Sequence, residues 1–392
     1  MTLFSKPAQD LAGLGGAKWT LYFRSKAKIA AGEDIVSLAI GEPEVAPPPE
    51  LAAGVMAALR AGSVGYTIGR GTLALRQVLA DRYSQRAGRD VSPDQVLITS
   101  GTQNALYLVL QTLAGPGDEV LVTDPSYATY EGLVKASGAT PVFVPLRPEA
   151  NFHLQCDDLA AKITPKTKAL LLNSPQNPTG AVLNAAEIAA IGQLAKRHDF
   201  WIISDEVYEE LVFDGFRFAS AFDQADLAAR TVVVASLSKS HAAAGYRAGW
   251  LLGTEAFCQA ALPITETELF GTPPFIQAAA ATVLAQGPSS VAPRMRANYA
   301  RRARQVFDAL DGHGGLKVTK PEAGMFVLLD VRARGQTSLE FGTQLLEEAG
   351  VAVMPGSSFG AALEGFVRVS LTVDDAALEK ALNNILSFLR SQ

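Results

Sequence analysis

The stretch that decides the fold reads Ser236-Leu237-Ser238-Lys239-Ser240-His241-Ala242-Ala243-Ala244-Gly245-Tyr246-Arg247-Ala248-Gly249. Apolar runs on either side of it, at 230–235 and 250–253, predict two neighbouring strands. Lys239 should therefore lie in the bend between them, where α/β sheets present groups to ligands. A lone lysine is usually a solvated surface charge. A lysine buried among small residues instead loses hydration, so its pKa falls and its amine can attack a carbonyl cofactor.

Short apolar runs alternate with helical segments through the middle of the chain. These runs lie at 96–99, 120–122, 141–144, 168–172 and 200–204. Runs that are apolar on both faces and separated by helices are typical of a mostly parallel sheet that helices cover on both sides. We therefore expect an α/β fold.

A change of composition near 287–293 indicates a hinge into a second region. Strands are predicted there at 324–329 and 366–370, followed by a closing helix, and a further strand is predicted near the N-terminus at 34–40. We expect a large domain at 46–288. Both chain ends, 1–45 and 289–392, should form a smaller α+β domain.

Composition excludes several classes of function. The chain has 392 residues and a formal net charge of −5, and the lack of a basic stripe gives no reason to expect nucleic acid. The densest basic stretch, 294–304, predicts a solvated helix face. No apolar run approaches membrane-spanning length, and residues 1–18 lack the apolar core of a secretory signal, so we expect no membrane partner and a cytoplasmic location. The two cysteines do not make a disulfide framework, and the four histidines show no metal-ligand spacing.

Polar residues follow several of the predicted strands. Ser100-Gly101-Thr102-Gln103 opens a helix, whose free N–H groups and dipole favour an anion such as phosphate, although such residues are usually simple caps. Asp205 ends an apolar strand, where an unpaired carboxylate is costly. A buried cation would be a suitable partner, and a helix N-cap is the alternative. Arg368 lies in an otherwise apolar strand, and such a charge is more often exposed at an edge than functional.

The segments quoted above together resemble the class I aminotransferases, which are fold-type I pyridoxal phosphate enzymes. The lysine signature of that family matches at Ser236, Ser238, Lys239, Gly245, Arg247 and Gly249. A second element, Asn173-Ser174-Pro175-Gln176-Asn177-Pro178-Thr179-Gly180, is similar to the family's Asn-Pro-Thr-Gly loop, although alone it could be an ordinary turn. The resemblance runs roughly from Tyr22 to Leu389. It implies a mostly parallel sheet of the seven-stranded type with a smaller α+β domain, and pyridoxal 5'-phosphate as the cofactor.

The resemblance also implies a role for each site residue. Lys239 would form a Schiff base with the cofactor and act as the general base, with Asp205 opposite the ring nitrogen and Tyr208 sharing the phenolic oxygen with Asn177. The implied cofactor contacts are Gly101, Thr102, Gln103, Tyr127, Asn177, Asp205, Tyr208, Ser236, Ser238, Lys239 and Arg247. The substrate carboxylate would be bound by Arg368, Gly41 and Asn177. Tyr66 would reach the phosphate of a neighbouring subunit, which implies a homodimer with shared sites.

The implied reaction moves the amino group of an L-amino acid to a 2-oxo acid, either pyruvate or 2-oxoglutarate. A lyase of the same fold, of the C–S β-lyase or aminocyclopropane-carboxylate synthase type, is the main alternative; a non-catalytic regulator with an attached DNA-binding module is a weaker one. The stretch 269–275 lacks the arginine that binds a second carboxylate in strict aspartate enzymes, and Phe270 and Phe275 suggest an apolar substrate pocket. This stretch and 238–241 resemble those of bacterial arginine–pyruvate transaminases. We expect Arg70 either to bind a substrate side chain or to face solvent.

Overall fold

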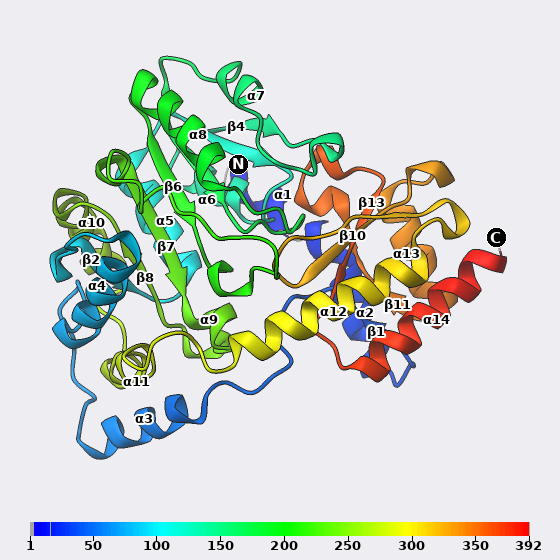
Figure 1. The fold of residues 1–392 in the computed structure, drawn as a ribbon, viewed down its shortest axis with the longest axis horizontal. Coiled ribbons are helices and arrows are strands. Elements are labelled where there is room, and N and C mark those ends of the chain that lie inside the picture. Colours follow the sequence, from blue (N-terminus) through cyan, green and yellow to red (C-terminus); the bar gives the residue numbers. More distant parts are fainter. Residues whose placement is uncertain (1–3, 16, 392) are drawn as a thin grey trace.

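A seven-stranded sheet runs through the larger part of the molecule (Figure 1). The computed structural model describes residues 4–15 and 17–391. The strand order is β2-β8-β7-β6-β5-β3-β4, and only β8 runs antiparallel to its neighbours. The strands are β2 (Val96–Thr99), β3 (Glu119–Asp124), β4 (Thr140–Pro145), β5 (Thr167–Asn173), β6 (Trp201–Asp205), β7 (Thr231–Ser236) and β8 (Gly249–Leu252). The predicted mostly parallel α/β sheet is confirmed.

Helices cover both faces of this sheet, which explains why its strands are apolar on both sides. One face packs against α5 (Thr102–Leu113), α6 (Tyr130–Ala136) and α10 (Glu255–Glu268). The other face packs against α8 (Ala185–His198) and α7 (Cys156–Ala160) near β5, and against α4 (Leu73–Ala87) and α11 (Pro274–Leu284) near β8. Helix α3 (Pro49–Arg60) lies on α11, and the short α9 (Leu237–Ser240) follows β7 directly.

The remaining elements form a smaller α+β region beside the carboxyl ends of the large sheet's parallel strands (Figure 1). Its antiparallel sheet has the order β12-β13-β10-β9, and β1 pairs with β11 in a separate parallel pair. The strands are β1 (Val36–Ser37), β9 (Lys317–Val318), β10 (Phe326–Asp330), β11 (Val351–Ala352), β12 (Met354–Pro355) and β13 (Phe366–Ser370). The helices of this region are α2 (Thr20–Ala30), α12 (Ala292–Leu310), α13 (Ser338–Ala349) and α14 (Asp375–Ser391), whereas α1 (Lys6–Gly15) packs against α6 of the larger part.

The boundaries of the two predicted domains stay a prediction, but the strands of the large sheet and those of the smaller sheets fall in different predicted domains. Every strand of the seven-stranded sheet lies within 46–288, and every strand of the smaller sheets lies outside that range. Among the described residues, no helix combines the length and the apolarity needed to cross a membrane.

The basic stretch 294–304 was expected to form a solvated helix face, and this expectation is wrong for Arg302 on α12. This side chain is only 4% exposed, and it forms ion pairs with Glu44 and Asp375 and donates to the Leu371 carbonyl. Tyr299, also on α12, donates to Glu44 at 2.9 Å. Its neighbour Arg301 is far more open to solvent. Helical periodicity identified the helix but could not identify a partner 258 positions away in the chain. These bonds fix the loop that follows β1 against α12.

Candidate active site

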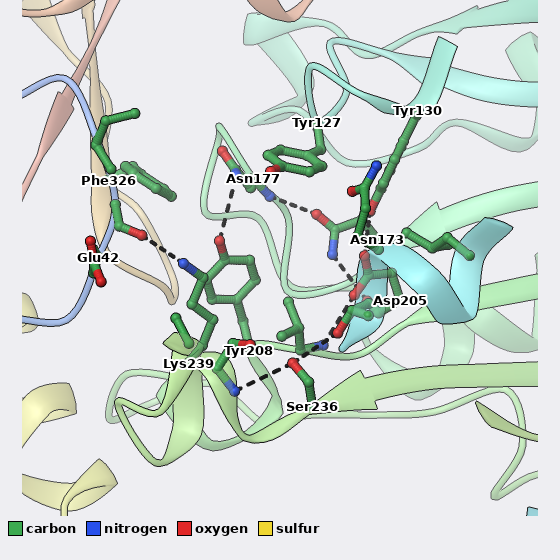
Figure 2. Close-up of a pocket in the computed structure, with 18 of the residues that line it drawn as sticks. Glu42, Tyr127, Tyr130, Asn173, Asn177, Asp205, Tyr208, Ser236, Lys239 and Phe326 are labelled. Atoms are coloured by element: carbon green, nitrogen blue, oxygen red, sulfur yellow. Dashed lines mark hydrogen bonds between the residues drawn. The ribbon is translucent and has the colours of Figure 1, made fainter. Parts of the chain in front are cut away.

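A cavity of about 330 Å³ lies where the large sheet meets the smaller region. Figure 2 shows that side chains from both parts of the molecule converge on it. The structure brings together nearly all of the residues that the sequence singled out. The predicted residues that line the cavity are Gly41, Thr102, Gln103, Tyr127, Asn177, Asp205, Tyr208, Ser236, Ser238, Lys239, Arg247 and Arg368.

Lys239 enters this cavity from α9, immediately after β7. Ser236 caps the short helix by accepting a hydrogen bond from the Ser238 N–H, and this turns the lysine toward the cavity. Its Nζ donates to the Gly41 carbonyl at 2.6 Å. Loss of solvent around the amine, reinforced by the positive charge of Arg368, lowers the pKa of Lys239 to about 8. An appreciable fraction is therefore an unprotonated nucleophile near neutral pH.

Asp205 is the last residue of β6 and is 4% exposed. Its Oδ2 accepts a hydrogen bond of 2.7 Å from the Tyr130 hydroxyl, and its Oδ1 accepts one from the Val207 N–H. Burial raises the pKa of Asp205 to about 6, and these hydrogen bonds oppose the shift. No cationic side chain pairs with it among the described residues. The carboxylate is therefore suited to a buried cationic partner such as a protonated pyridine nitrogen.

The amino end of α5 forms a cradle for an anion. Gly101 precedes the helix with φ +86°, and a Cβ there would lie 2.4 Å from Nη2 of Arg247. Glycine thus lets the guanidinium approach the helix terminus, where Arg247 donates to the Ser100 carbonyl. Thr102 and Ser236 hold their hydroxyls 2.9 Å apart at the same place. A cation, free helix N–H groups and two hydroxyls fit a phosphate group.

Asn177 and Tyr208 connect the cofactor side of the cavity to the smaller region. The Asn177 Nδ2 donates to the Tyr208 hydroxyl at 3.4 Å, while its Oδ1 accepts a hydrogen bond of 2.9 Å from Arg368. Burial raises the pKa of Tyr208 above its ordinary value, so the hydroxyl keeps its proton and can donate it in a hydrogen bond. Asn173 supports the loop by accepting from the Asn177 N–H and donating to the Asp205 carbonyl.

Arg368 is buried within β13, and the alternative of an edge-exposed charge is wrong. Its side chain is 2% exposed. The guanidinium carbon lies 3.8 Å from the centroid of the Phe326 ring and 4.4 Å from that of the Phe359 ring. Its Nη2 donates to the Ala39 carbonyl, but its buried Nε has no hydrogen-bond partner. Because an unsatisfied buried donor is costly, an arriving carboxylate would be favourable here. Burial also lowers the pKa of Arg368 to about 10, which leaves it charged at neutral pH.

Two predicted positions lie off the cavity of their own chain. Gly101 shapes the cradle but does not line it. Tyr66 is 92% exposed and packs edge-on against Phe270 at a centroid distance of 5.2 Å. A separate hollow beside Tyr66 includes Phe275, so neither phenylalanine lines this chain's cavity.

The prediction that Arg70 faces solvent is wrong, and Arg70 does not line the cavity of its own chain. The side chain is 7% exposed and forms an ion pair of 2.9 Å with Asp94, which Arg76 also contacts. It therefore neither faces solvent nor reaches the cavity. The ion pair holds it against the turn before β2.

Sequence reasoning missed several residues that complete the cavity. Tyr130 is the most informative, since it binds Asp205 directly; its spacing of three from Tyr127 is the one signal that could have pointed to it. The other additions come from segments far apart in the chain. They include Trp19, Ile40, Glu42, Leu106, Asn173 and Phe326.

Residues 33–385 match the family described as aminotransferase class I and II. The chain belongs to this family. It is 41% identical over 382 residues to arginine–pyruvate transaminase AruH of Pseudomonas aeruginosa, covering 97% of each chain. It is also 33% identical to an aspartate aminotransferase of Geobacillus stearothermophilus, covering 95% of this chain and 96% of that one. A solved aspartate aminotransferase from Thermotoga maritima superimposes with a TM-score of 0.92 at 33% identity, covering 99% of this chain and 100% of that chain.

Family membership gives the activity. The protein is a pyridoxal phosphate-dependent aminotransferase, acting on amino acid and 2-oxo acid substrates. The cradle at α5, the buried carboxylate of Asp205 and the enclosed amine of Lys239 fit the three parts of that cofactor: its phosphate, its ring nitrogen and its aldehyde.

The lowered pKa of Lys239 predicts how cofactor-free enzyme recaptures pyridoxal phosphate. Only the unprotonated amine can react with the aldehyde. The rate of recapture should therefore be low in acid, rise through a midpoint near pH 8 and reach a plateau above it. Stopped-flow absorbance across pH 6 to 10.5 measures this directly. A midpoint near the ordinary lysine value of about 10.4 would show that the cavity does not perturb the amine.

Proposed function

We propose that this enzyme transfers the amino group of L-arginine to pyruvate, with Lys239 as the residue that binds the cofactor covalently. One observation carries the proposed site: a reactive amine, a buried carboxylate and an unsatisfied arginine N–H meet in one cavity beside a phosphate-fitting cradle. Pyridoxal phosphate, when bound, supplies a carbonyl carbon for the amino group and a ring that withdraws electrons from it.

The residues of the chain then divide the remaining work. Lys239 would hold the cofactor, and its amine, once free, would act as the general base on the donor's Cα proton and as the general acid that returns this proton to the carbon of the cofactor's former aldehyde. Asp205 would keep the ring nitrogen protonated through an ion pair. Asn177 and Tyr208 would donate hydrogen bonds to the ring oxygen, and Tyr127 would stack on the ring. Thr102, Gln103, Ser236, Ser238 and Arg247, together with Gly101, surround the phosphate.

The substrate α-carboxylate is assigned to Arg368. Its free Nε offers the missing hydrogen bond, and the two flanking rings hold the guanidinium plane fixed. Gly41 lies on the loop that faces Lys239, where a Cβ would lie 2.2 Å from the Phe326 ring, so glycine lets the loop pack closely on that ring. Fixing this end of the substrate places the Cα proton within reach of the Lys239 amine.

The proposed donor follows from the charges and from the relative. The cations that line the cavity of one chain are Lys239, Arg247 and Arg368, and each already has a role. A donor with a second carboxylate would need a further cation. The lining instead adds Glu42 and an apolar wall of Trp19, Ile40 and Leu106, which suits an alkyl stem with a cationic end. The 41% identity to an arginine–pyruvate transaminase supports the same donor and acceptor.

A homodimer with shared sites is the proposed assembly. Tyr66 lies far outside its own chain's cavity, among exposed apolar side chains that include Val64, Ile68 and Phe270. Such a contiguous apolar surface favours burial against another protein surface. A two-fold pairing through this surface would bring Tyr66 to the partner's cavity, as the family resemblance implies.

Two further assignments complete the proposal. Residues 46–288 act as the cofactor domain, and 1–45 with 289–392 as the substrate domain, since the former carries the proposed cofactor contacts and the latter carries Gly41 and Arg368. Cytoplasm is the proposed location; Cys156 and Cys258 are both free thiols, which suits a reducing compartment.

The donor assignment predicts a clear preference. With pyruvate as acceptor, kcat/KM for L-arginine should exceed that for L-aspartate by roughly tenfold or more, because an aspartate side chain would be left as an unpaired charge. Alanine formation measures the rate, and Lys239→Ala should give none with either donor. A preference for aspartate would contradict the donor assignment while leaving the transaminase intact. In single-turnover mixing with arginine alone, the cofactor should be converted to pyridoxamine phosphate. A C–S β-lyase needs a leaving group on the substrate Cβ, so release of thiol, pyruvate and ammonia from a cysteine S-conjugate, with no pyridoxamine phosphate formed from arginine, would indicate a lyase.

The shared site predicts complementation between two defective variants. Lys239→Ala and Tyr66→Ala homodimers should each be impaired, because one lacks the amine and the other lacks a phosphate contact. After mixing and subunit exchange, each hybrid dimer contains one site with both residues intact, so activity should recover to roughly a quarter of the wild-type value. Native mass spectrometry confirms that hybrids form. Hybrids without recovered activity, or a monomeric enzyme, would overturn the shared site.

A further inference from the structure

The segment after β6 points its side chains alternately in two directions. Asp205 and Tyr208 line the cavity, whereas Glu206, Glu209 and Glu210 turn away from it, toward α4. A tight turn enforces this alternation, since the Glu209 N–H donates to the Glu206 carbonyl and the Leu211 N–H donates to the Tyr208 carbonyl. The outward carboxylates and the two inward groups therefore project from one hydrogen-bonded backbone turn.

Two arginines of α4 hold the outward carboxylates. Arg86 contacts Glu206 at 2.9 Å and Glu209 at 2.6 Å, while Arg82 contacts Glu209 and Glu210 at 2.8 Å each. Their spacing of four residues places both guanidinium groups on one face of the helix. Glu206 also accepts hydrogen bonds from the Ser204 and Ser220 hydroxyls. We name Arg82, Arg86, Glu206, Glu209 and Glu210 the back-face clamp.

The arginine end of the clamp is itself fixed. The Arg86 guanidinium lies 4.7 Å from the centroid of the Tyr83 ring and 5.4 Å from that of Phe218, and its Nε donates to Asp223. Tyr83 is fully buried, and its hydroxyl accepts a hydrogen bond of 2.9 Å from the Trp250 indole on β8. The clamp therefore connects the turn after β6 to β8 of the same sheet through packed, buried side chains.

Stability alone does not explain so many buried charges. Well-packed apolar residues in their place would often be as stable or more stable, because desolvating ion pairs is costly. Burial raises the pKa of Glu206 to about 7, while the charge of Arg86 opposes that shift. What an ion-pair network adds is a defined geometry, since a guanidinium donates N–H hydrogen bonds only along fixed directions, as Arg86 does to Glu209 and Asp223.

We propose that Arg86, assisted by Arg82, is a positioning residue that sets the placement of Asp205 and Tyr208 by holding Glu206, Glu209 and Glu210. Neither arginine lines the catalytic cavity. This inference rests on the proposed roles of Asp205 toward the ring nitrogen and of Tyr208 toward the ring oxygen.

The test compares Arg86→Lys with Arg89→Lys in the holoenzyme. The lysine keeps a positive charge at position 86 but lacks the fork that reaches Glu206, Glu209 and Asp223 together. We expect kcat to fall on the order of 100-fold, as for a small misplacement of catalytic groups, with KM for both substrates changed by less than about threefold. Arg89 contacts Phe222, and no residue of 205–210, so Arg89→Lys should leave kcat unchanged.

Two readouts separate positioning from a general loss of stability. The pH midpoint of the holoenzyme's visible absorbance should move in Arg86→Lys, because that midpoint reports on the groups facing the ring nitrogen and oxygen. Apoenzyme of the same variant should bind pyridoxal phosphate more weakly. Glu206→Gln, which keeps the side-chain shape, should shift the absorbance midpoint in the same direction and serves as the second variant should Arg86→Lys not fold.

Asp205→Asn and Tyr208→Phe, measured alongside, distinguish a failure of the proposed cofactor roles from a failure of the clamp inference. If both leave turnover and absorbance unchanged, the proposed roles of Asp205 and Tyr208 are wrong. If they impair the enzyme while folded Arg86→Lys and Glu206→Gln keep the wild-type kcat and absorbance midpoint, the clamp does not position them, and the inference is overturned.

Discussion

Everything in this structure depends on burying Asp205 at the end of a central strand. A carboxylate removed from water there is expensive without a cation, and the described residues offer it only hydrogen bonds from Tyr130 and a backbone N–H. The same cavity holds Lys239, whose pKa burial lowers to about 8, and Arg368, whose Nε is unsatisfied. Each of these groups lacks a partner that the cofactor or the substrate supplies. The site is prepared for ligands at an energetic cost to the empty protein.

The fold supplies the rigidity that keeps these groups apart and aligned. Strands β5, β6 and β7 end side by side in parallel, so Asn173, Asp205 and Ser236 arrive at one edge of the sheet. The smaller region closes that edge from the opposite side, with Arg368 on β13 and the Gly41 loop held by Arg302 through Glu44. On the far side of the β6 turn, the back-face clamp holds the carboxylates that alternate with the catalytic groups. On this one turn, Asp205 and Tyr208 are thus the proposed cofactor contacts, and the glutamates between and after them are the proposed means of holding these two residues in place.

Much of this arrangement could be predicted from sequence because the signals are local. Strands buried on both faces appear as continuous apolar runs, and the residues around Lys239 and Asn177 follow in fixed order after such runs. What the sequence could not supply are contacts between distant segments. Tyr130 reaching Asp205 and Arg302 reaching Glu44 depend on how elements pack, which periodicity does not encode. Arg70 was misread for the same reason, since its partner Asp94 lies 24 residues away beyond a helix.

The central claim is that the amine at position 239 is the point of covalent attachment. Borohydride reduction of the holoenzyme, followed by proteolysis and peptide mass spectrometry, tests it most directly. We expect a single phosphopyridoxyl-modified peptide, with the modification on Lys239. A modification on another lysine, or an unmodified Lys239 in enzyme that retains full activity, would contradict it.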